Sequence, residues 1–335
     1  MVENAFLRFI DMKMEKWGSG CEGNDGKVRN FVCENEQCMK RTVRMCVLVL
    51  CCMLWSAASR AQEVDYVIES KRGVVENGYD FWVTRPKSYE AGEDSVPLVV
   101  FLHGASLCGR NMERVKRYGT IDAVERGLEL EAVCVAPHNR GGAWKPARVM
   151  EVVKYMERHY RIDTCRIYVL GMSLGGFGVL DFVGTYPDKI AAALALCGGC
   201  TLRSYEGLSK LPLYIVHGDA DAAVKVEKSR EIVREIKEKY DSTLLKYTEL
   251  DGVNHSKPAH AFYHLDTYDW LFRHDLEERA LDTTFTITRE MLYSPYQLTR
   301  SGEVKPGYKK GRSYVKRSKK SARRSRKSGR RRRRK

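Results

Sequence analysis

Short runs of consecutive apolar residues recur through the middle of the chain, and amphipathic stretches of helical length lie between most of them. A run that is apolar at every position, as at residues 96–102, indicates a strand buried on both faces of a sheet. Strands are expected at residues 79–84, 96–102, 132–136, 166–170, 191–196, 211–216 and 244–250, and helices at residues 111–126, 147–160, 175–186 and 226–240. This alternation predicts an α/β fold in a single domain, a mostly parallel, twisted sheet with helices on both faces.

One predicted strand leads directly into a candidate nucleophile. Residues 166–170 run into Gly171-Met172-Ser173-Leu174-Gly175, which is a G-x-S-x-G motif, and a helical pattern follows. Small residues are needed there because the turn from strand to helix is sharp and the serine must stand exposed. Ser173 is therefore the candidate nucleophile. A phosphate-binding turn is the weaker alternative, because the motif does not contain the Lys-Ser/Thr pair of a P-loop.

A serine hydroxyl needs a base, and the base needs a carboxylate that orients it. The strand at residues 211–216 is followed by His217-Gly218-Asp219-Ala220-Asp221, and the strand at residues 244–250 is followed by Asp251-Gly252-Val253-Asn254-His255. Ser173, Asp221 and His255 each follow a strand, in the chain order of an α/β-hydrolase triad. Asp219 remains open as an alternative acid.

Two further histidines compete with His255 for the role of the base. His260 and His264 have an i, i+4 spacing that could also mimic a metal pair. We favour His255 because it follows the last strand on a turn, whereas the other two lie in a predicted C-terminal helix that reaches His274.

These motifs together resemble the esterase branch of the α/β-hydrolase superfamily. The resemblance rests on Leu102-His103-Gly104, on residues 171–176, on residues 217–224 and on Asn254-His255, and it covers residues 79–274. Similar proteins include phospholipase/carboxylesterases, dienelactone-hydrolase-like proteins, feruloyl-esterase and polyhydroxybutyrate-depolymerase-like esterases, and predicted peptidases related to prolyl oligopeptidase. By this resemblance Asp221 is the acid of the pattern H-G-x-x-D-x-x-V. Apart from the resemblance, we expect His103 and His217 to be structural and not catalytic. Dienelactone hydrolases proper carry Cys where Ser173 stands.

The site also needs two backbone N–H groups for the developing oxyanion. Leu174, directly after the nucleophile at a helix start, is expected to supply one of them. The resemblance implies that Ala105 supplies the other, with Ser106 nearby as a helper. Trp144 follows another strand end, so both a place in the substrate pocket and plain packing remain open for it.

The two ends of the chain differ from the predicted domain at residues 62–280. A basic segment, an apolar run at residues 45–55 and small residues before Gln62 have the layout of a signal peptide at residues 39–61, cleaved near Ala61. The run is too short to span a membrane, so we expect export to the periplasm or medium. Residues 1–38 are then a mis-assigned start or a disordered extension. A cytosolic extension is the alternative, and a native N-terminus near Met1 would favour it.

The charge of the chain is concentrated in a tail. The whole sequence has 58 Lys and Arg against 43 Asp and Glu, a formal net charge of +15, yet 18 of the basic residues and none of the acidic ones lie at residues 305–335. We expect this tail to be disordered after a C-terminal extension at residues 281–304. It could bind an anionic envelope polymer, anionic lipid or nucleic acid, or remain a solvated tail. With 43% hydrophobic residues, the body is not a disordered or collagen-like chain.

The chain has 11 cysteines, of which five follow the predicted leader: Cys108, Cys134, Cys165, Cys197 and Cys200. Cys197 and Cys200 form a single C-x-x-C without a second pair, so a local disulfide or buried thiols are favoured over zinc or redox chemistry. Neither a metal nor an organic cofactor is implied.

The expected protein is an exported serine hydrolase that cleaves carboxylic esters, of small molecules, carbohydrates or lipids, through an acyl-enzyme. Two alternatives stay open. One is a serine peptidase of the prolyl-oligopeptidase type, and the other is an inactive hydrolase body that carries a polyanion-binding tail.

Overall fold

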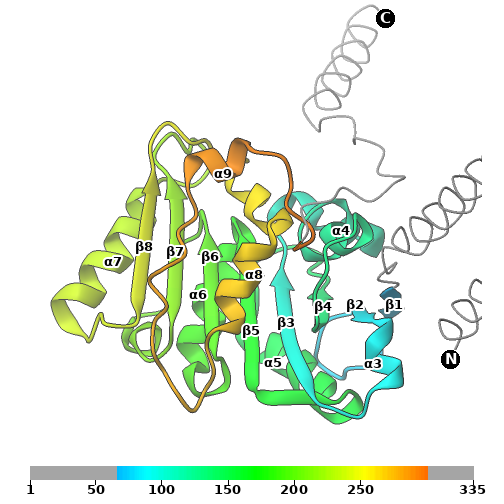
Figure 1. Ribbon diagram of the computed structural model, residues 1–335. Helices are drawn as coiled ribbons and strands as arrows, with labels where there is room; N and C mark the ends of the chain where they lie inside the picture. The colour runs from blue at the N-terminus through cyan, green and yellow to red at the C-terminus, as the bar shows by residue number, and fades with distance from the viewer. Residues whose placement is uncertain (1–65, 301–335) are drawn as a thin grey trace, which may run out of the picture. The chain divides into compact units, whose positions relative to one another are not determined.

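A computed structural model describes residues 66–300, and within this range the strands form one eight-stranded sheet (Figure 1). The strands are β1 (Tyr66–Lys71), β2 (Phe81–Pro86), β3 (Val96–Leu102), β4 (Val133–Pro137), β5 (Ile162–Met172), β6 (Ala192–Leu196), β7 (Leu213–Gly218) and β8 (Leu245–Leu250). They lie in the order β1-β2-β4-β3-β5-β6-β7-β8. The pairs β1–β2 and β2–β4 are antiparallel and the other pairs are parallel. The predicted mostly parallel sheet is confirmed, with β1 as the strand that was not predicted.

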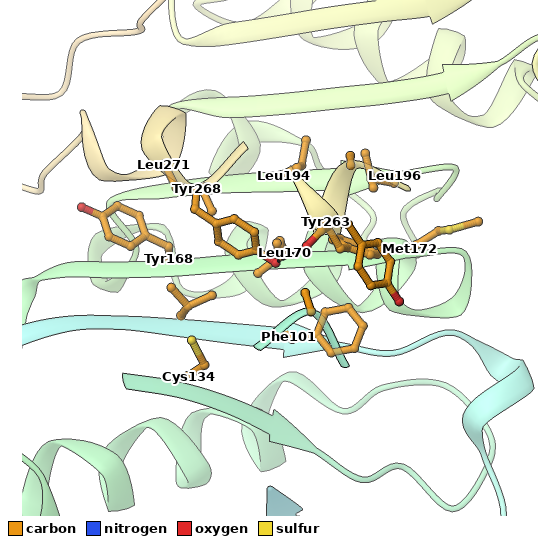
Figure 2. Packing of buried hydrophobic residues seen from close by; sticks show 14 of the residues in the cluster. Phe101, Cys134, Tyr168, Leu170, Met172, Leu194, Leu196, Tyr263, Tyr268 and Leu271 are labelled. Atoms are coloured by element: carbon orange, nitrogen blue, oxygen red, sulfur yellow. Dashed lines mark hydrogen bonds between the residues drawn. The ribbon is translucent and has the colours of Figure 1, made fainter. Parts of the chain in front are cut away.

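The continuous apolar runs form strands that are buried on both faces, because successive side chains point to opposite sides of the sheet. In β3, Val99 and Phe101 pack into one core, while Leu98 and Val100 pack into the other. Figure 2 shows five residues of the first core that lie on the adjacent strands β3, β5 and β6: Phe101, Tyr168, Leu170, Met172 and Leu194. The sheet thus separates two hydrophobic cores.

Helices cover both faces of this sheet (Figure 1). The α-helices are α3 (Lys87–Ala91), α4 (Thr120–Glu125), α5 (Pro146–His159), α6 (Leu174–Thr185), α7 (Glu227–Lys239), α8 (Leu265–Phe272) and α9 (Arg289–Tyr293). The 3-10 helices are η1 (Ala105–Leu107), η2 (Met112–Arg117), η3 (Pro187–Lys189), η4 (Glu206–Ser209) and η5 (Pro258–Tyr263). Buried residues of α5, α6 and α7 belong to one core, and those of α4, η5 and α8 to the other. The helices predicted at residues 147–160, 175–186 and 226–240 are confirmed as α5, α6 and α7.

The single helix predicted at residues 111–126 is wrong, because the chain breaks between η2 and α4. The break falls at Gly119, which has φ +97°, a conformation that residues with a side chain rarely adopt. A Cβ at this position would overlap the ring of Phe101. Glycine therefore lets the chain turn where it passes over the sheet.

The continuous C-terminal helix predicted to carry both His260 and His264 and to reach His274 is also wrong. The chain forms η5, then an extended residue at His264 with φ −120° and ψ 120°, and then α8. The break has a tertiary cause. His264 forms an isolated parallel β-bridge with Gln297, and the Leu265 N–H donates to the Gln297 carbonyl at 2.8 Å.

Residues 276–300 return across the domain and contribute to its core. Ile287 and Leu292 are fully buried, the Trp270 indole donates to the Asp282 carbonyl at 2.9 Å, and the Ile287 N–H donates to the Tyr214 hydroxyl at 3.0 Å. No helix within residues 66–300 is both long enough and apolar enough to cross a membrane. The predicted signal peptide at residues 39–61 and the basic tail at residues 305–335 lie outside the described residues.

Candidate active site

Ser173 lies on a sharp turn between β5 and α6. Its backbone has φ 59° and ψ −124°, an unfavourable conformation for a residue with a side chain, and its N–H donates to the Leu196 carbonyl on the next strand at 2.9 Å. The neighbouring chain leaves little room, because a Cβ at Gly171 would lie 2.5 Å from the Leu102 carbonyl oxygen and one at Gly175 would overlap it. The G-x-S-x-G pattern is thus required by the packing of this turn.

The structure brings the three predicted triad residues together from three different loops. His255 Nε2 lies 2.9 Å from Ser173 Oγ, and His255 Nδ1 lies 2.6 Å from Asp221 Oδ2. The Asp221 side chain is fully buried, whereas 26% of the His255 side chain is exposed. The imidazole therefore sits between a buried carboxylate and the hydroxyl of half-buried Ser173, the arrangement required of a general base.

The surroundings of Asp221 keep its carboxylate ionised and oriented. Burial raises the pKa of this carboxyl, but hydrogen bonds from His255 and from the Val224 and Ala223 amides outweigh burial, so the pKa lies below its usual value. Both amides donate to Oδ1, at 2.9 and 2.8 Å, which leaves Oδ2 for the imidazole.

The alternatives to these residues occupy other positions. Asp219 accepts a hydrogen bond from the Gly252 N–H at 2.7 Å and so holds the loop that precedes His255. His260 packs edge-on against Tyr296, with ring centroids 5.5 Å apart. Neither contact involves Ser173 or His255.

The two predicted oxyanion amides both lie at helix starts. Leu174 is the first residue of α6 and Ala105 is the first residue of η1. Such amides have no carbonyl partner within their own helix, and at the start of the 12-residue α6 the helix dipole also favours negative charge. Both N–H groups are therefore suited to bind an anionic oxygen.

His103 orients the Ala105 amide through a hydrogen bond to the other end of the same peptide group, the Gly104 carbonyl. The Asn139 N–H donates to His103 Nε2 at 3.0 Å, so the ring proton resides on Nδ1, which donates to the Gly104 carbonyl at 2.9 Å. The N–H and C=O of a trans peptide point in opposite directions, so holding the Gly104 oxygen directs the Ala105 N–H the other way. Burial lowers the pKa of His103 to about 4, which keeps the ring neutral.

Tyr118 is a residue of this site that the sequence patterns did not indicate. Its hydroxyl accepts the Gly104 N–H at 3.0 Å, and a Cβ built on Gly104 would lie 2.6 Å from this hydroxyl and 3.5 Å from Ser173 Cβ. Tyr118 follows η2 at the break before Gly119, so no motif or periodicity marked it.

Of the two predicted pocket residues, Trp144 is buried. Only 3% of it is exposed, its indole donates to the His103 carbonyl at 3.2 Å, and its ring lies against Tyr79 with centroids 5.0 Å apart. The tryptophan therefore packs behind the loop at His103-Gly104, which favours the packing alternative that the sequence left open. Ser106 is exposed beside Ala105, and its carbonyl accepts a bond from Arg114 at 2.6 Å.

The five described cysteines are free thiols, so Cys197 and Cys200 form no disulfide. Burial raises the pKa of both, and each lies beside a carboxylate that raises it further, Asp221 for Cys197 and Asp181 for Cys200. Thiols held protonated in this way are poor nucleophiles.

A sulfur, a nitrogen and an oxygen that could ligate a metal come together behind the triad. The ligand atoms of Cys197, His217 and Asp221 lie within 4.8 Å of one another, and all three residues are buried. Their polar atoms are already engaged, since Asp221 accepts bonds from His255 and from two amides and His217 contacts the Val224 carbonyl at 3.0 Å. A cation here would compete with His255 for the Asp221 carboxylate. The cluster therefore fits a hydrogen-bonded network better than a metal site.

Comparison with known proteins identifies the fold. A crystal structure of a thermostable esterase superposes with a TM-score of 0.51 at 24% identity, covering 63% of this chain and 63% of that one. This likeness and the strand order show that the chain has the α/β-hydrolase fold, as predicted.

Two curated proteins match parts of the sequence. A bifunctional acetylxylan esterase/xylanase of Neocallimastix patriciarum is 23% identical over 115 residues, 34% of this chain and 17% of that protein. A poly(3-hydroxyalkanoate) depolymerase of Paucimonas lemoignei is 34% identical over 58 residues, 17% of this chain and 14% of that protein. The chain thus spans less than a fifth of either relative, and no family model matches it. The names of these relatives agree with the resemblance to the esterase branch.

Proposed function

We propose that the protein is a serine hydrolase that cleaves carboxylic esters. The observation that carries this proposal is the continuous hydrogen-bonded chain from Ser173 through His255 to Asp221, with contacts of 2.9 and 2.6 Å. The amides of Leu174 and Ala105 at two helix starts supply the second requirement of acyl transfer, a site for the oxyanion.

The reaction follows from these positions. Ser173 Oγ attacks the ester carbonyl carbon while His255 Nε2 takes the hydroxyl proton, and Asp221 stabilises the imidazolium that forms. The tetrahedral oxyanion binds the Leu174 and Ala105 amides. Collapse of this intermediate releases the alcohol, which leaves with the proton from His255. Water activated by His255 then attacks the acyl-enzyme, releases the acid and restores Ser173.

The names of the curated relatives support esters of polymers as substrates. One relative is an acetylxylan esterase, which suggests an acylated carbohydrate, and the other is a polyester depolymerase. The open position of the triad is compatible with a polymer, because Ala105, Ser106 and Asn254 around it are exposed.

Covalent labelling tests the proposal at Ser173. An organophosphonate ester should add to Ser173 once per chain and stop hydrolysis of p-nitrophenyl esters, whose acyl chains range from acetate to long fatty acids. Mass spectrometry of peptides locates the label. The Ser173→Ala protein should be neither labelled nor active, whereas Ser106→Ala, a change at an exposed neighbouring serine, should still be labelled at Ser173.

Two results would overturn this function. A folded protein that hydrolyses no ester in the panel and takes up no label would favour the inactive-body alternative. Turnover of peptides but not esters, lost in Ser173→Ala, would instead favour a peptidase.

We further propose that the protein is exported, with cleavage near Ala61, and that residues 305–335 bind polyanions outside the cell. The support is the pattern at residues 39–61 and the 18 positive charges of the tail. The full-length protein should bind immobilised heparin at low salt and elute as salt rises, while a protein that ends at residue 304 should pass through. Retention that survives the deletion would contradict the role of the tail.

A further inference from the structure

A second histidine lies behind the triad and has no part in the reaction described above. His217 is the fifth residue of β7, and both its side chain and that of Asp221 are fully buried. His217 Nε2 lies 3.3 Å from Asp221 Oδ2, the same oxygen that accepts the bond from His255 Nδ1. One carboxylate oxygen therefore faces two imidazoles, one of them exposed in part and one buried.

The neighbours of His217 fix which of its nitrogens carries the proton. Nε2 lies 3.0 Å from the Val224 carbonyl, which can only accept, so Nε2 is protonated. Burial lowers the pKa of the His217 ring, so the ring is neutral and Nδ1 is an acceptor. Nδ1 lies 2.7 Å from the Ser229 hydroxyl, which can donate to it. The Nε2–H is thereby directed at the Val224 carbonyl, with Asp221 Oδ2 as its second acceptor.

This geometry constrains the Asp221 carboxylate from two sides. The Ala223 and Val224 amides hold Oδ1, and the buried His217 ring confines Oδ2 from the other side, with Nε2 3.3 Å away and Oδ2 as the second acceptor of its proton. A carboxylate held at both oxygens cannot rotate, so Oδ2 stays in line with His255 Nδ1. Ser229 on α7 and Val224 in the preceding loop anchor the histidine in turn.

We propose that His217 is a positioning residue, which acts on the reaction by holding Asp221 Oδ2 in line with His255. The inference rests on the proposed function, because it assigns His217 a part in the same site. From the sequence alone, we expect His217 to be structural only. The structural role and the positioning role differ in what they predict for variants that fold.

A matched pair of substitutions separates the two roles. In His217→Gln, the side-chain amide reaches the place of Nε2 and can still donate toward Val224 and Asp221. In His217→Asn, the shorter amide reaches only the place of Nδ1, so the donor to Asp221 is lost. We expect His217→Asn to lower kcat about tenfold with unchanged KM, the loss of one buried hydrogen bond, and His217→Gln to recover most of it.

The downfield proton resonance of the His255 Nδ1–H, bonded to Asp221, provides a second readout that needs no substrate. It should broaden or shift in His217→Asn and persist in His217→Gln. A merely structural role would lower the unfolding midpoint of both variants and leave kcat per folded molecule and the resonance unchanged, which would overturn the proposal. If the protein hydrolyses no ester at all, the resonance still decides the positioning role.

Ser229→Ala keeps the test decisive if His217→Asn does not fold. The change removes the hydroxyl that anchors His217 at Nδ1 and that also contacts the Gly198 carbonyl at 3.5 Å, while the Val224 carbonyl that accepts from Nε2 stays in place. We expect a several-fold lower kcat, an unchanged KM and a broadened His255 resonance. Unchanged kcat and resonance in Ser229→Ala would contradict the inference.

Discussion

Asp221→Asn is expected to lower kcat for ester hydrolysis by about 10⁴-fold, although the substitution preserves the shape of the side chain. The Ala223 and Val224 N–H groups both donate to Oδ1, so the carbonyl oxygen of an asparagine would have to occupy that place. Its NH₂ group would then face His255 Nδ1, which must become an acceptor. The remaining ring proton moves to Nε2, and Nε2 can no longer take the proton of Ser173.

Asp219→Asn is the matched control for this prediction. Asp219 lies two residues away, and its Oδ1 accepts a bond from the Gly252 N–H that an asparagine carbonyl can also accept. We therefore expect kcat to stay within about twofold of wild type. A large loss in Asp219→Asn with little loss in Asp221→Asn would make Asp219 the acid of the triad.

Steady-state kinetics on the best ester of the panel measures both variants, with the unfolding midpoint as a check on folding. The expected signature is a loss in kcat for Asp221→Asn without a matching rise in KM, because the wrong tautomer affects proton transfer and not substrate binding. Equal losses of kcat in the two variants would mean that general disturbance of the loop, and not the tautomer of His255, limits the reaction.

The sequence predicted the parts of the site that depend on local geometry. Ser173 could be identified because a strand-to-helix turn this sharp excludes side chains at Gly171 and Gly175. The two glycines that result form the recognisable G-x-S-x-G pattern. Asp221 and His255 could be placed because parallel strands end at one edge, so residues far apart in the chain meet there. The strands could be predicted because burial on both faces requires continuous apolar runs.

The parts that were missed or mistaken depend on contacts between distant segments. Tyr118 supports Gly104, fourteen residues earlier, through one hydroxyl, and a single polar contact leaves no periodic pattern. The break at His264 is made by its pairing with Gln297, which no helix propensity in residues 260–274 reveals. Trp144 was left open between pocket and core because a strand-end position fits both, and its contacts with His103 and Tyr79, which favour packing, again join distant segments.

The same logic explains why so many polar groups lie behind the reacting atoms. His103 holds the Gly104 carbonyl, Tyr118 holds the Gly104 N–H, and two amides hold Asp221 Oδ1. Each bond fixes a group before substrate arrives, so little reorganisation remains for the reaction itself. The cost is that one of these groups, His103, is a buried imidazole, which can hold its place only while it is neutral.

The folded protein is therefore expected to lose stability as pH falls from about 6.5 to about 4. Burial is the largest cause of a lowered pKa in six of its histidines: His103, His138, His217, His260, His264 and His274. Each pKa is lower in the folded chain than in the unfolded chain, so the unfolded chain binds more protons in this window. Protonation therefore favours unfolding as the pH falls.

His103 sets the scale of the effect, because its pKa is lowered to about 4. Against an unfolded value of about 6.5, this one ring contributes ~2 kcal/mol of stability at pH 7 that is lost by pH 5, and ~3 kcal/mol that is lost by pH 4. The carboxyls with lowered pKa, such as Asp221 and Glu249, add to the loss only below about pH 5. A loss that begins near pH 6.5 is thus specific to the histidines.

Urea unfolding at steps from pH 7.5 to pH 5 measures this dependence, and His103→Asn tests its origin. The variant should be less stable at pH 7.5, because the Asn139 N–H loses its acceptor, but its stability should fall less steeply with pH. His159→Asn changes an exposed histidine on α5 and should leave the slope as in wild type. A slope that is the same in all three proteins would mean that His103 does not stay neutral in the folded chain, and the orientation assigned to the Ala105 amide would then lose its basis.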